Sequence, residues 1–70
     1  MIEVFKTNVS DKEQASTLLD LLTQQFPGNK INFDLHDCDK ILRIDGSDYI
    51  VDDIMNLLNT QGFECEILTS

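Results

Sequence analysis

The sequence predicts an α+β fold, with strands and helices in the order β-α-β-β-α-β, from three observations. Two segments carry apolar residues at the three- and four-residue spacing of a helix with one buried face. Four short segments alternate apolar and polar residues, as half-buried strands do. The chain has only 70 residues, so connections must be short. Together these predict one domain over residues 1–70, a ferredoxin-like two-layer sandwich. Its four-stranded antiparallel sheet should have the order 4-1-3-2, with both helices on one face.

The first strand and the first helix take up the first third of the chain. Residues 1–6 predict a strand, with Ile2 and Val4 on its inner face. Ser10 and Glu13 have the spacing of a capping box, which predicts a helix beginning at Ser10. A Pro-Gly pair then ends the helix. The apolar stripe of this helix consists of Ala15, Leu18, Leu19, Leu22 and Phe26.

The middle of the chain, from Asn29 to Gly46, predicts a β-hairpin. Its first strand should turn Ile31, Phe33 and Leu35 inward, and its second strand Leu42 and Ile44. The turn between them, residues 36–39, is polar, and its Asp side chains can bond nearby backbone amides.

The last third of the chain repeats the pattern of a helix followed by a strand. Ser47 or Asp48 is expected to cap a helix that runs to about Gln61, with Gly62 after its end. The apolar stripe of this helix consists of Val51, Ile54, Met55 and Leu58. Residues 63–68 predict the final strand, with Phe63, Cys65 and Ile67 facing inward.

The charge of the chain narrows the class of partner. Thirteen acidic and five basic residues give a net charge of −8. Phosphate-binding proteins gain affinity from Lys and Arg, so nucleic acid and anionic membranes are not expected partners. No apolar run approaches the roughly 20 residues of a membrane span, and no secretory signal is visible. Two distant cysteines make no disulfide framework, so we expect a cytoplasmic protein with free thiols.

Two segments resemble a known family. The sequence Gly62-Phe63-Glu64-Cys65-Glu66 is similar to the entry into the last strand of heavy-metal-associated domains, the small copper-chaperone-like domains, and residues 40–46 resemble their third strand. The resemblance implies their fold. Members of this family bind soft metals through a Gly-Met-x-Cys-x-x-Cys loop. In this sequence Asn8 stands at the Gly position of that loop and Val9 at the Met position. Asp11 and Gln14 stand at the two Cys positions. Both thiolates are missing, so the resemblance implies no metal site and no cofactor.

A different metal site is the alternative interpretation. His36 and Cys38 lie in the hairpin turn, and Asp11 lies at the start of the first helix, at the same end of the predicted sandwich. Zinc accepts imidazole, thiolate and carboxylate ligands, so these three residues could hold it. An exposed, Asp-rich turn explains the same residues without a metal. A metal carrier would bind one equivalent of Zn(II) or Cu(I) and lose it in Cys38→Ser.

The face of the sheet away from the helices is the preferred candidate site. The predicted alternation places Phe5, Ile41, Arg43 and Leu68 there, inside a rim of polar side chains. An apolar centre with a polar rim is typical of protein interfaces, so a protein partner or self-association is expected on this face. One histidine and no Gly-rich phosphate loop indicate no enzyme. The sequence therefore predicts a small, acidic, non-catalytic interaction module.

Overall fold

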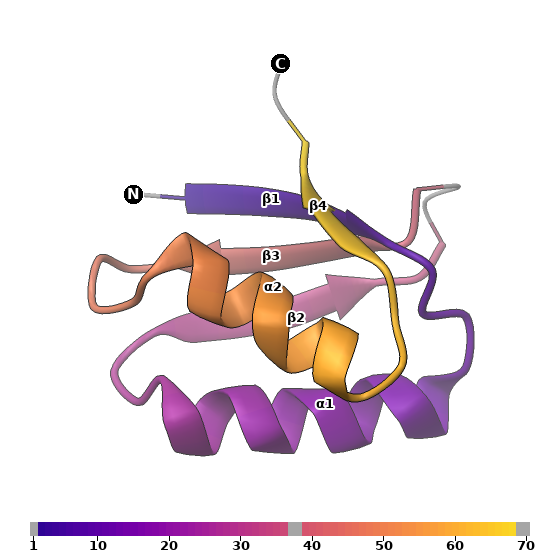
Figure 1. Ribbon diagram of the computed structural model, residues 1–70, viewed down its shortest axis with the longest axis horizontal. Coiled ribbons are helices and arrows are strands. Elements are labelled where there is room, and N and C mark those ends of the chain that lie inside the picture. The colour runs from indigo at the N-terminus through magenta and orange to yellow at the C-terminus, as the bar shows by residue number, and fades with distance from the viewer. Residues whose placement is uncertain (1, 37–38, 69–70) are drawn as a thin grey trace.

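The computed structural model describes residues 2–36 and 39–68 of the chain. The elements follow one another as β1 (Ile2–Thr7), α1 (Lys12–Gln25), β2 (Lys30–Asp34), β3 (Ile41–Asp45), α2 (Val51–Thr60) and β4 (Cys65–Ile67). The strands form one antiparallel sheet in the order β2-β3-β1-β4 (Figure 1). This is the predicted order 4-1-3-2 read from the other edge, and it confirms the ferredoxin-like α+β arrangement.

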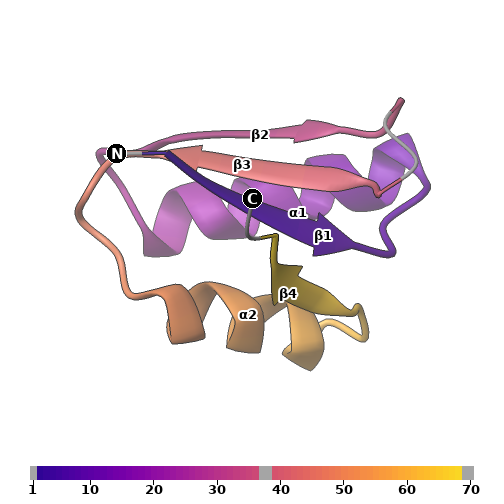
Figure 2. The same ribbon diagram turned by 90° about the horizontal axis from the view of Figure 1, so that it is seen from above.

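Both helices lie against the same face of the sheet, α1 beside β2 and α2 beside β4 (Figure 2). The layer between the helices and the sheet is the hydrophobic core. Its buried members are Phe5, Val9, Ala15, Leu18, Leu22, Phe26, Leu42, Ile44, Ile54, Leu57 and Leu58. Neither helix of the described chain is long and apolar enough to cross a membrane.

The start of α1 differs by one residue from the prediction. Asp11, not Ser10, is the N-cap: its backbone is extended, and its carboxylate accepts a hydrogen bond from the Glu13 amide at 2.8 Å. The Ala15 amide donates to the Asp11 carbonyl at 2.9 Å, which closes the first turn. Ser and Asp are both good N-caps, so the sequence could not decide between neighbours.

The predicted cap of α2 is wrong, and its predicted end is correct. The N-cap is Ile50, which makes no side-chain hydrogen bond, so neither Ser47 nor Asp48 caps this helix. At the other end Gly62 adopts a φ of +92°, which favours glycine. Its amide donates to the Asn59 carbonyl at 3.0 Å, and the Phe63 amide donates to the Leu58 carbonyl at 2.9 Å. This pair of bonds is a Schellman motif, which satisfies the last carbonyls of the helix.

The faces of β1 are the reverse of those predicted. Phe5 is 0% exposed and lies opposite Leu42 of β3, so it belongs to the core. Ile2 and Val4 alternate with it and therefore occupy the open face. The strand has apolar residues on both sides, and alternation alone could not tell which side faces the helices. The pairing with β3 decides it, because Leu42 and Ile44 are both fully buried.

A buried threonine joins the end of β1 to the hairpin. The Thr7 hydroxyl donates to the Lys40 carbonyl at 2.6 Å and accepts from the Val9 amide at 3.2 Å. Nearby, the Asn8 side chain accepts from the Glu64 amide at 2.8 Å. These bonds bring the β1–α1 loop, the start of β3 and the entry to β4 together at one end of the sandwich, as predicted.

Candidate functional site

The open face of the sheet is defined by the cross-strand register. Its side chains come from alternate positions of the strands, and they lie opposite one another in three rows. One row holds Lys30, Asp45 and Ile2; the next holds Asn32, Arg43, Val4 and Leu68; the third holds Asp34, Ile41, Lys6 and Glu66. No helix of the described chain covers these rows (Figure 2).

The apolar part of this face lies over β1 and the end of β4. Ile2 is 58% exposed and Leu68 is 41% exposed, and the half-buried Val4 lies between them. The Leu68 amide donates to the Val4 carbonyl at 2.9 Å, so the two residues are direct neighbours. We call Ile2, Val4 and Leu68 the apolar strip. The predicted positions of Arg43 and Leu68 on this face are therefore correct, whereas sequence reasoning missed Ile2 and Val4.

Two of the predicted contact residues cannot contribute much surface. Phe5 lies in the core, on the other side of the sheet. Ile41 does belong to the open face but is only 4% exposed. Lys6 and Asp34 lie beside it on the neighbouring strands, and Lys6 reaches the Asp39 carboxylate at 3.8 Å. Long side chains often cover apolar neighbours in this way.

Charge is distributed unevenly between the two sides of the molecule. The open face carries three of the five basic residues, Lys6, Lys30 and Arg43, and three of the thirteen acidic ones, Asp34, Asp45 and Glu66. These six charges cancel. Ten acidic and two basic residues remain elsewhere in the chain, and they account for the whole net charge of −8. The three rows of the open face are thus neutral in a strongly acidic protein, and the Asp39 carboxylate lies beside Lys6 at their margin.

A groove runs between α1 and the outer strand β2. It has a volume of about 550 Å³, and Ala15, Leu19, Phe33 and Leu35 supply its apolar lining. Residues from both faces of β2 line it, including Asn32 and Asp34, so the groove follows the edge of the strand. Half-buried Phe33 and Leu35 leave apolar surface there that the domain itself does not cover.

The predicted metal ligands remain a prediction. Asp11 is exposed, and its carboxylate is engaged as the cap of α1. His36 is exposed, and its amide donates to the Asp34 carboxylate at 3.2 Å. Cys38 lies outside the described residues. Among residues 2–36 and 39–68, the structure brings together no group of three His, Cys, Asp or Glu side chains that could hold a metal ion.

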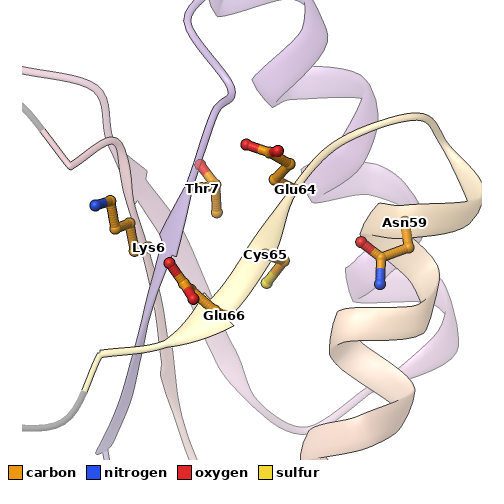
Figure 3. A pocket seen from close by; sticks show the side chains of 6 residues that line it. All are labelled: Lys6, Thr7, Asn59, Glu64, Cys65 and Glu66. Carbon is orange, nitrogen blue, oxygen red and sulfur yellow. The ribbon is translucent and has the colours of Figure 1, made fainter.

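Cys65 lines a second hollow, between β4 and α2 (Figure 3). Its side chain points from β4 toward α2, while Glu66 points to the other side of the strand. Burial, with a smaller contribution from the Glu66 carboxylate, raises the pKa of the Cys65 thiol to about 11. A thiol with a raised pKa is a poor nucleophile and a poor metal ligand at neutral pH. Cys65 is therefore a packing residue, as the sequence predicted.

This pKa predicts slow alkylation of Cys65. In Cys38→Ser, which leaves one thiol, iodoacetamide should react with the folded protein roughly a hundredfold more slowly at neutral pH than with the urea-unfolded chain. The rate should rise roughly tenfold for each pH unit until the pH nears 11. Equal rates in the folded and unfolded states would contradict the burial of this thiol.

The raised pKa of Cys65 also makes the stability of the fold depend on pH. Because folding raises this pKa, the protonated thiol favours the folded state. The contribution of this thiol to the free energy of unfolding is complete below the pKa that the thiol has in the unfolded chain, and it is lost as the pH rises toward 11.

Neither models of protein families, nor curated proteins, nor solved structures give a match to this chain. The resemblance to heavy-metal-associated domains therefore stays a prediction from the sequence. What the structure defines is a class: a small α+β sandwich with an uncovered, charge-neutral sheet face and an open edge strand.

Proposed function

We propose that this protein is a non-catalytic interaction module that binds another protein through the open face of its sheet. The observation that carries the proposal is the charge distribution. The open face is neutral and holds the apolar strip, while the remainder of the chain carries the net charge of −8. Burial of apolar surface drives association, and a neutral face avoids the cost of burying unpaired like charges.

The chemistry of the face indicates the kind of partner. The partner should place an apolar surface against the apolar strip, flanked by charges of both signs that match Lys6, Arg43 and Glu66. Nucleic acid does not fit, because three cations balanced by three carboxylates give no net attraction for phosphates. A second copy on this face fits less well than a different protein, because Arg43 lies near its centre and would meet its own counterpart.

The experiment is site-specific photo-crosslinking in the cells that make the protein. A photoreactive residue in place of exposed Leu68, in the apolar strip, should give one discrete product, whereas the same residue at exposed Gln24 on α1 should give none. Ile2→Asp should reduce the product several-fold. Ile2 is mostly exposed, but an Asp there would lie opposite Asp45 of β3, so this change should lower the free energy of unfolding by about 1 kcal/mol and leave the domain folded.

Three results would contradict the proposal. They are equal yields from the probes at positions 68 and 24, a yield that Ile2→Asp leaves unchanged, and a product with twice the mass of the chain. The last would assign the face to self-association. Circular dichroism of each variant checks that the fold is retained.

A further inference from the structure

The two edges of the sheet differ in their capacity to pair with another strand. At one edge β4 has only three residues. At the other, β2 has five residues, no proline, and a continuous one-to-one register with β3 without a bulge. No described helix or strand lies outside β2 (Figures 1 and 2). Natural proteins usually block such an edge with prolines, bulges or charged side chains, because its free backbone groups can bind another strand.

We propose that β2 pairs with β2 of a second copy of this chain, antiparallel and centred on Asn32, so that two sheets join into one. This pairing is self-complementary. A two-fold axis at Asn32 sets Lys30 of each copy opposite Asp34 of the other, which gives two pairs of opposite charge. The site is distinct from the open-face surface of the proposed function and does not depend on it.

The charge match singles out this register and this edge. A joined sheet keeps each side chain on its own face, so the axis must pass through a residue position. Centring on Ile31 or Phe33 would set Lys30 or Asp34 opposite Asn32 and lose both charge pairs. The other edge disfavours pairing, because an axis at the middle of β4 would set Glu66 against its own copy. Like charges directly opposite each other destabilise a sheet.

The apolar side of β2 also favours a second copy. In the same register Ile31 lies opposite Phe33 of the partner copy, on the face that bears α1. Both residues are half-buried in the single chain, and Phe33 lines the groove beside α1. Pairing would cover apolar surface that the isolated domain leaves partly open, and it would add backbone hydrogen bonds along the strand.

The test uses two variants, each of which should dimerise only weakly by itself and should pair with the other when the two are mixed. Lys30→Asp leaves only negative charges on the edge, and Asp34→Lys leaves only positive ones. Sedimentation velocity should show a wild-type dimer at concentrations up to about 1 mM and a roughly tenfold weaker one for each variant. An equimolar mixture should form a heterodimer close to wild-type strength, because every opposite-charge pair is restored. Amide hydrogen exchange in β2 should slow as the wild-type concentration rises.

The controls separate this inference from the proposed function. Lys6→Asp makes the same charge change in the centre of the sheet, and Val4→Asp alters the apolar strip, so both should keep the β2 dimer. Circular dichroism checks that each variant is folded. A wild-type monomer at about 1 mM, or a mixture no tighter than its components, would overturn the inference. The absence of a crosslinked product from the photoreactive residue at position 68, in a chain whose apolar strip is otherwise unaltered and which still dimerises, would instead count against the open-face proposal alone.

Discussion

Replacing Phe5 with Ala is expected to lower the free energy of unfolding by about 3–5 kcal/mol. Phe5 is 0% exposed and packs in the core opposite Leu42, so the change removes a buried aromatic ring and leaves a cavity. At about 0.05–0.15 kcal/mol per residue, a chain of this length has only about 4–10 kcal/mol of stability in total. The variant should therefore be close to unfolding at room temperature. Urea titration followed by circular dichroism measures the change.

Val4→Ala is the matched control for this prediction. Val4 is adjacent in sequence but lies on the open face and is half-buried, so its truncation should cost less than about 1 kcal/mol. The contrast tests the orientation of β1. If Phe5 were on the open face, as alternation in the sequence suggested, Val4→Ala would be the more costly change.

Gly46→Ala is expected to destabilise the protein by about 1–3 kcal/mol. A Cβ at residue 46 would overlap the side-chain carbonyl of Asn29. The Asn29 amide cannot move freely, because its Nδ2 donates to the Phe26 carbonyl at 3.0 Å and to the Asp48 carbonyl at 3.3 Å. These bonds join the end of α1 to the β3–α2 loop. Thermal unfolding of the variant beside the wild type measures the loss.

A double-mutant cycle isolates this contact. Asn29→Ala alone should lower the free energy of unfolding by about 1 kcal/mol. It removes two hydrogen bonds, which destabilises the fold, but it also removes a buried Oδ1 that has no hydrogen-bond partner in the described structure, which offsets part of the loss. Combined with Gly46→Ala it should cost clearly less than the sum, because the space for the new Cβ is then free. Additivity to within about 0.5 kcal/mol would show that the two residues do not interact.

Much of this fold follows from local patterns in the sequence. The helical stripes around Leu18 and Ile54 and the alternation around Phe33 set the type and order of the elements. Short connections and right-handed crossovers then leave few topologies, and the predicted strand order is the observed one. Gly62 also marks the end of α2 from sequence alone, because a positive φ at that point favours glycine.

The candidate site was only partly predictable. Arg43 and Leu68 were placed correctly on the open face, since their strands have one clearly apolar side. Phe5 was placed wrongly because β1 has apolar residues on both sides, and Ile41 was not expected to be covered by its neighbours. The N-cap of α1 was misplaced by one residue for a similar reason, since two good capping residues are adjacent.

The elements, their order and the net charge of −8 follow from the order of the residues alone. The pairing of distant strands sets which side of β1 faces the helices, which charges share the open face, and which of the two edge strands is longer. Local periodicity depends on neighbours a few residues apart. The faces of a sheet depend on the register between strands that are far apart in the chain, as Phe5 and Leu42 are.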